Sequence, residues 1–213
     1  MDITRVLADM AIKRPIFYSE ADFQHALAWE IHRRWTGCFV RLEYKPREVQ
    51  ERIYLDIWAE NRGCVVAIEV KYKTRSLHNI GFNGETFDLL NQSAQDVGRY
   101  DFLKDLQRLE RIISARSKVI GYAVLLTNDN SYWKPPRSPQ TVDANFRIHD
   151  GQLMTGKLGW QKGASEGTMR HREMPIVIKG KYRLRWRDYS EPSKALYGKF
   201  SYLLVECKSS LLC

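Results

Sequence analysis

The first clear pattern of hydrophobic and polar positions covers residues 18–35. Phe23, Leu27 and Ile31 recur every four residues and form one apolar stripe at ~100° per residue. Ser19 stands just before this pattern as a candidate N-cap, with acidic residues in the following turn and arginines near the end. The pattern therefore predicts an amphipathic helix over residues 18–35.

Three segments after this helix have the composition and length of β-strands. Two of them flank the sequence ENRG, which is a good turn between antiparallel strands. We therefore predict a hairpin preceded by one further strand. The three predicted strands are residues 38–44, 51–59 and 64–72.

The pattern changes again after the hairpin. Residues 74–90 read as a loop, and residues 91–113 carry helical spacing of apolar positions. Residues 118–127 form a continuous apolar run, as in a strand that is buried on both faces. A strand, a helix and a second buried strand are the crossover expected of a parallel pair.

The last third of the chain is less regular. Residues 128–172 are rich in proline, glycine and charge and predict long surface loops. Two late strands, residues 175–187 and 200–207, are expected to complete the sheet. The sequence thus predicts a single α/β domain over residues 1–213, with a core over about 18–127 and a loop-rich β extension over about 128–213.

Composition and charge narrow the class of protein. The chain has 213 residues, 44% of them hydrophobic and 28% charged, which is typical of a globular protein. No apolar run is long enough for a membrane span, and the N-terminus does not resemble a signal peptide, so we expect a cytoplasmic protein with no membrane partner. A net charge of +9 favours an anionic partner, of which nucleic acid is the commonest.

Acidic residues interrupt the predicted hairpin. Asp56 lies in its first strand, and Glu69 and Lys71 lie two residues apart in its second. Glu69 and Lys71 should share one face, with Val70 pointing into the core, and the turn should bring Asp56 close to them. A buried ionised carboxylate is costly unless it is compensated, and Mg²⁺ binds such paired oxygen ligands. The hairpin therefore predicts a site for metal-assisted phosphodiester hydrolysis.

The spacing D56-x12-E69-V70-K71, on a hairpin between two helices, resembles the PD-(D/E)xK nuclease superfamily of restriction endonuclease-like proteins. The resemblance implies an αβββαβ core with a mixed central sheet flanked by helices. It also implies that Asp56 and Glu69 bind Mg²⁺ (or Mn²⁺) with help from the Val70 carbonyl, and that Lys71 is catalytic. Leu55 stands where the family name has proline. The implied activity is that of a metal-dependent phosphodiesterase, specifically an endonuclease acting on DNA.

Many members of this superfamily have a further metal-binding glutamate on the first helix. Glu20 matches because it falls on the apolar stripe of the predicted helix. The alternative role of Glu20 is to stabilise the helix N-terminus. Glu30 and Glu43 are rival acids for the same role.

Many members also carry a polar motif on the helix after the hairpin. The sequence NQSAQDVGRY offers Gln92, Gln95, Arg99 and Tyr100 as candidate contacts to a nucleic-acid backbone. The alternative is a solvated helix start with an internal hydrogen bond.

A second Glu-x-Lys triplet lies near the end of the chain. Glu206 and Lys208 repeat the spacing, with Asp188 upstream, but a long segment separates the acids and no helix–strand unit follows. We expect this triplet to lie on the exposed face of a strand.

Other functions remain open from sequence. The rival hypothesis is a non-catalytic nucleic-acid-binding module with a nuclease-like fold, and an RNA substrate is a third alternative. Restriction, defence and repair all use such a core. Because one active site cuts one strand, double-strand cleavage commonly needs a dimer, and a homodimer is one alternative.

Overall fold

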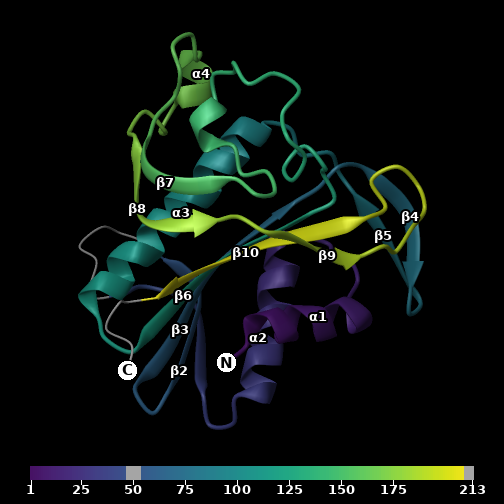
Figure 1. Ribbon diagram of the computed structural model, residues 1–213. Helices are drawn as coiled ribbons and strands as arrows, with labels where there is room; N and C mark the ends of the chain where they lie inside the picture. The colour runs from purple at the N-terminus through teal and green to yellow at the C-terminus, as the bar shows by residue number, and fades with distance from the viewer. Residues whose placement is uncertain (47–53, 209–213) are drawn as a thin grey trace.

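The computed structural model describes residues 1–46 and 54–208. Within these ranges a six-stranded mixed sheet runs through the centre of the molecule in the order β1-β2-β3-β6-β10-β9 (Figure 1). β3 and β6 pair in parallel, as predicted, and the other neighbours are antiparallel. The strands are β1 (Phe39–Tyr44), β2 (Leu55–Asn61), β3 (Cys64–Lys73), β6 (Val119–Thr127), β9 (Trp186–Ser190) and β10 (Phe200–Lys208).

Helices cover both faces of this sheet. α1 (Ile3–Lys13), which the sequence analysis did not predict, lies with α2 (Glu20–Arg34) on one face, and α3 (Gln95–Ala115) lies on the other. The Ser19 side chain caps α2 by accepting a hydrogen bond from the Asp22 N–H, as expected. None of the helices in the described ranges is long and apolar enough to cross a membrane.

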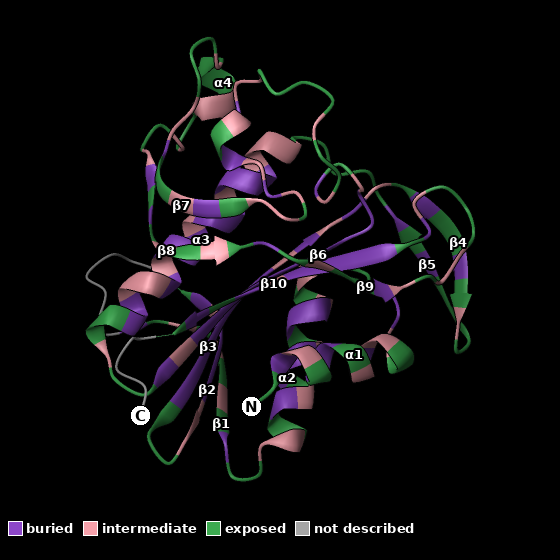
Figure 2. Ribbon diagram, viewed as in Figure 1, coloured by how far each residue is buried: buried purple, intermediate pink, exposed green. Residues whose placement is uncertain are grey.

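Two hydrophobic cores result, one on each face (Figure 2). Phe23, Leu27 and Ile31 are fully buried in the core under α1 and α2, which confirms the predicted apolar stripe. The second core lies between the sheet and α3. The fold is therefore mixed α/β, with β3 and β6 buried between helical layers.

The segment predicted as a loop over residues 74–90 is instead a β-hairpin, so that prediction was wrong. β4 (Leu77–Phe82) pairs with β5 (Glu85–Leu89) through a turn at Asn83 and Gly84, whose φ angles are 49° and 80°. Polar residues on the exposed side hide the strand pattern in the sequence. The apolar residues that carry it are buried on the first core.

The C-terminal extension also differs from the prediction. The expected strand over 175–187 is broken, because Leu184 turns into the second core between β8 (Ile176–Arg183) and β9. Only β9 joins the central sheet, whereas β8 pairs with β7 (Leu153–Leu158) in a separate two-stranded ribbon that packs on α3. The expected loop region contains further short elements. These elements and the ribbon are η1 (Ala144–Phe146), β7 (Leu153–Leu158), α4 (Glu166–Met169) and β8 (Ile176–Arg183).

Candidate active site

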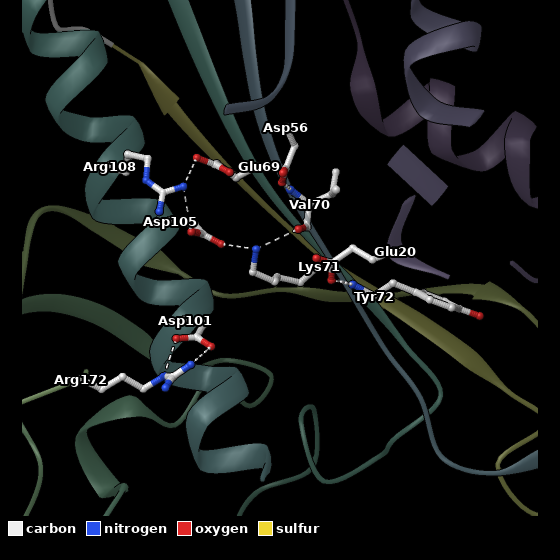
Figure 3. A network of polar contacts seen from close by, with 10 residues as sticks. All are labelled: Glu20, Asp56, Glu69, Val70, Lys71, Tyr72, Asp101, Asp105, Arg108 and Arg172. Carbon is white, nitrogen blue, oxygen red and sulfur yellow. Dashed lines mark hydrogen bonds and ion pairs between the residues drawn. The ribbon is translucent and has the colours of Figure 1, made fainter. Parts of the chain in front are cut away.

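The candidate site lies where the ladder between β2 and β3 ends. The two strands pair as far as Ile57 and Ile68. Beyond that point carboxylates, not backbone carbonyls, satisfy two N–H groups of β3 (Figure 3). Val70 N donates to Asp56 Oδ2 at 2.6 Å, and Tyr72 N donates to Glu20 Oε2 at 2.8 Å. The opened ladder thus places acids from two other elements against the edge of β3.

Side chains from α3 complete the cluster. Lys71 Nζ donates to the Val70 carbonyl at 3.1 Å and lies 2.7 Å from Asp105 Oδ2, in an ion pair that is not aligned as a hydrogen bond. Arg108 Nη1 lies 2.6 Å from Glu69 Oε1 and 3.3 Å from Asp105 Oδ1. Asp105 therefore lies between two cations, one from β3 and one from its own helix (Figure 3).

The alternation of β3 decides which side chains reach α3. Glu69 and Lys71 extend the row of Val65 and Ala67, which belongs to the core under α3, while Val70 belongs to the opposite core. This confirms the predicted orientation of the triplet. The Glu69 side chain is only 2% exposed and that of Lys71 17%. Both charges are therefore held largely away from water.

Burial dominates the acid–base properties of the carboxyl groups. It raises the pKa of Asp56, against the opposing effects of the Lys71 ammonium and the hydrogen bond from Val70 N. It raises the pKa of Glu69 well above its ordinary value, and the charge of Asp105 raises it further. The pKa of Asp105 is also raised by burial, in spite of Lys71 and Arg108. The folded protein therefore disfavours negative charge at three neighbouring carboxyls.

The neighbouring carboxylates favour the charged form of Lys71. Burial by itself would lower the pKa of Lys71, but Asp105, Glu20 and Asp56 together raise it above its ordinary value. Lys71 is thus protonated at neutral pH, and its ammonium group can donate to a water molecule or a phosphate oxygen. It is poorly suited to accept a proton in this state.

The three candidate acids for a wider metal shell lie in different places. Glu20 is bound to the β3 backbone next to Lys71. Glu30 instead faces basic residues of α1 and α2, and its hydrogen bond with Arg33 lowers its pKa to about 2. Glu43 accepts from Gln24, whose side chain also donates to the Asp56 carbonyl. Of the three, Glu20 lies beside the cluster, and its metal-binding role stays a prediction.

The predicted nucleic-acid contacts are only partly at the surface. Arg99 and Tyr100 are almost fully buried; Arg99 pairs with Asp143 at 2.8 Å, and the Tyr100 hydroxyl donates to a backbone carbonyl. Gln92 is exposed, and Gln95 lines a polar hollow of about 570 Å³ with Arg99. Both buried side chains therefore have structural partners, Gln95 also donates to Asp129 at 2.9 Å, and contact of these residues with a nucleic acid stays a prediction.

The sequence analysis missed Asp105 and Arg108. Both belong to α3, three residues apart and hence on one side of the helix. Asp105 sits directly before Leu106 in the apolar stripe and is 6% exposed. An acid beside the buried stripe of an amphipathic helix was the available signal, because it requires a partner across the core.

The donor chemistry of the cluster fits a divalent cation. Asp56, Glu69 and the Val70 carbonyl offer oxygen atoms at one end of β3, and Mg²⁺ commonly takes one or two carboxylates and keeps several waters. Burial raises the pKa of both carboxyls, so a bound cation would favour their ionised forms. Within residues 1–46 and 54–208, however, no group of three or more His, Cys, Asp or Glu side chains is arranged to hold a metal ion.

Comparisons with known proteins give no independent assignment. No protein-family model, curated protein or solved structure matches the chain.

Proposed function

We propose that the protein is a Mg²⁺-dependent nuclease that hydrolyses phosphodiester bonds, with DNA as its substrate. One observation carries this proposal. The ladder between β2 and β3 opens at Asp56, whose carboxylate accepts from Val70 N, while Lys71 donates to the Val70 carbonyl and Glu69 lies beside them on β3, facing Arg108. Ionisable groups whose pKa values are shifted by burial together with a specific charged partner are typical of functional sites.

The order of elements supports the finer assignment of the fold. α2, β1, β2, β3, α3 and β6 follow one another as in the αβββαβ core of restriction endonuclease-like proteins, with the β4–β5 hairpin inserted. We propose this correspondence on element order and on the position of the acids.

In the proposed reaction each side chain has a separate role. A bound divalent ion would lower the pKa of a water molecule and stabilise the leaving oxygen. Asp56 and Glu69 would hold that ion, and the Lys71 ammonium would orient the attacking water or stabilise charge on the phosphate. Asp105 would act as a positioning residue, since it holds Lys71 from the α3 side.

One observation favours the rival function, a non-catalytic nucleic-acid-binding module. Arg108 already neutralises Glu69 at 2.6 Å, so the acids have a cation without any metal. A dormant site of this kind would bind DNA and release no product.

A cleavage assay separates the two functions. Linear, circular, branched and single-stranded DNA, and RNA, would be incubated with Mg²⁺, Mn²⁺ or EDTA. We expect metal-dependent products that Asp56→Asn abolishes and that the matched control Asp188→Asn, at an exposed acid of β9, leaves unchanged. Binding without products on every substrate would refute the nuclease and support the rival. Mapping both strands of the product would show whether two copies act together.

A further inference from the structure

Five basic residues alternate along one stretch of the chain, KGKYRLRWR, residues 179–187. All five are exposed, whereas Leu184 between them is buried. Side chains two residues apart in a strand point to the same face, and the burial pattern of β8 leaves its three members exposed together. We call this set the basic row; its members are Lys179, Lys181, Arg183, Arg185 and Arg187.

The charge of the basic row is largely uncompensated. Among the residues that the structure describes, Arg185 is the member with a carboxylate within ion-pair distance, and its Nη1 lies 3.9 Å from Asp150 Oδ2. Arg183 and Arg187 donate to a carbonyl and a hydroxyl oxygen. The row therefore keeps most of its positive potential for an external anion.

The β8 part of the row is rigidly held. Glu110 of α3 accepts from Lys179 N at 2.9 Å, from Gly180 N at 2.7 Å and from the Tyr182 hydroxyl at 2.9 Å. Ile178 is buried in the core beside α3. A charged strand that is fixed before binding loses little conformational freedom when a partner docks.

The ribbon adds one more base to the same face. Lys157 of β7 lies opposite Val177 of β8 in the antiparallel register, and both residues are exposed. Directly opposed residues share a face of a two-stranded ribbon. The positive surface thus extends across both strands.

α3 separates the basic row from the candidate active site. Arg108 contacts Glu69 on β3, whereas Glu110, two residues further along, contacts β8. Residues two apart on a helix point in nearly opposite directions, at about 200°. The row is therefore a second surface and not a wall of the site itself.

We propose that the basic row docks the phosphate backbone of a nucleic acid. The choice of nucleic acid rests on the proposed function, since any polyanion would be attracted. The arrangement favours a linear polyanion, because Lys179, Lys181 and Arg183 follow one another along a single exposed strand. The row binds without reading sequence, because its contacts are to phosphates.

The test measures duplex binding by fluorescence anisotropy in EDTA at several salt concentrations. The variant Lys179→Ser/Lys181→Ser/Arg183→Ser removes three charges from the row. If each contacts one phosphate, the slope of log K against log salt falls by about 2 to 3, and binding at moderate salt weakens at least about tenfold. The matched control removes three exposed charges that face acids elsewhere, namely Lys13→Ser/Arg33→Ser/Lys194→Ser, and should change affinity less than about twofold.

Several outcomes would contradict the proposal that the basic row binds nucleic acid. Equal losses in both triple variants would show that net charge matters and the row does not. Unchanged DNA binding with lost binding to phosphatidylglycerol vesicles would identify a membrane surface instead. If melting shows that the triple variant is unfolded, Lys179→Glu/Lys181→Glu serves in its place. Binding that depends on the row, without cleavage in the presence of Mg²⁺ or Mn²⁺, would refute the proposed nuclease activity and support the proposal for the row.

Discussion

Two Glu-x-Lys triplets lie on the same central sheet and have opposite surroundings. Glu69 and Lys71 of β3 are 2% and 17% exposed, whereas Glu206 and Lys208 of β10 are 35% and 56% exposed. The first pair is bound by charges from α3, and the second pair forms an ion pair with itself. Identical spacing therefore produces a buried charge cluster in one strand and a solvated surface pair in the other.

The difference arises from the neighbouring strands. Asp56 lies beside Val70, within the first triplet, because β2 stops pairing there. Asp188, the acid upstream of the second triplet, aligns with Ser201, five residues from Glu206 and hence about 17 Å away along the strand. Asp188 also pairs with Lys199 at the surface. The triplet of β3 thus receives an acid from the adjacent strand, whereas the described residues of β6 and β9 place none beside Glu206 and Lys208.

The largest effect should come from replacing the lysine of each triplet, one at a time, by methionine. Lys71→Met removes the ammonium that faces the candidate site, and cleavage should fall about 10²–10³-fold, as when one group that stabilises developing charge is lost. Lys208→Met removes an exposed lysine at the same triplet position and should leave cleavage within about twofold. Initial rates on one DNA substrate with Mg²⁺ measure both. Equal rates for Lys71→Met and wild type would exclude a catalytic lysine on β3.

Unpairing the buried cluster should have an effect of similar size, measured as stability. Asp105→Ala leaves the charges of Lys71 and Arg108 without their shared carboxylate, and the free energy of unfolding should drop by about 3–5 kcal/mol. Asp188→Ala, at a surface ion pair with a 76% exposed acid, should cost about 0–1 kcal/mol.

Urea unfolding at pH 7 compares the two proteins. The double variant Lys71→Met/Asp105→Ala should recover part of the loss, because it leaves one buried cation fewer. A drop below about 1 kcal/mol for Asp105→Ala would show that water already reaches the cluster.

Much of the fold follows from local pattern. The α2 stripe of Phe23, Leu27 and Ile31, and the apolar run that becomes β6, carry periodicity strong enough to fix their type. The hairpin of β4 and β5 was missed because its exposed positions are polar and its burial depends on the tertiary core. Leu184 breaks the expected late strand for a similar reason, since only the packed core shows where it turns.

The candidate site was predictable only from the β-strand side. Asp56, Glu69 and Lys71 come together because strand alternation and one turn fix their geometry within about 20 residues. Asp105 and Arg108 come from a helix more than 30 residues further on, whose rotation against the sheet no local pattern specifies. The opening of the ladder at Ile57 is likewise a tertiary feature.

Removing the guanidinium that pairs with Glu69 should increase the affinity of the buried triplet for a divalent cation. Arg108→Gln leaves Glu69 free for a cation, so Mn²⁺ should bind about tenfold more tightly without DNA, a change of about 1.4 kcal/mol from one lost neighbouring charge. Lys104→Gln removes a positive charge elsewhere on α3 and is the matched control. Calorimetric titration measures both. Weaker Mn²⁺ binding by Arg108→Gln would show that the arginine holds Glu69 in place for the metal.

The smallest expected effect compares two acids whose pKa values shift in opposite directions. Arg33 lowers the pKa of Glu30 to about 2, so ionised Glu30 stabilises the fold above its ordinary pKa of 4.5, and this contribution is lost as the pH falls from 4.5 towards 2. Burial raises the pKa of Glu69, so its contribution is present below 4.5 and is lost as the pH rises above that value.

Melting temperatures in EDTA between pH 3 and 7.5 test both signs. Relative to wild type, Glu30→Gln should melt lower at neutral pH, with the gap closing towards pH 3. Glu69→Gln, which mimics the protonated acid, should match wild type near pH 4 and melt higher at pH 7, by a few degrees at most. The exposed Glu206→Gln should run parallel to wild type throughout. If Glu69→Gln melts lower at pH 7, the bridge to Arg108 outweighs burial, and the cluster is a stabilising ion pair that requires no added cation.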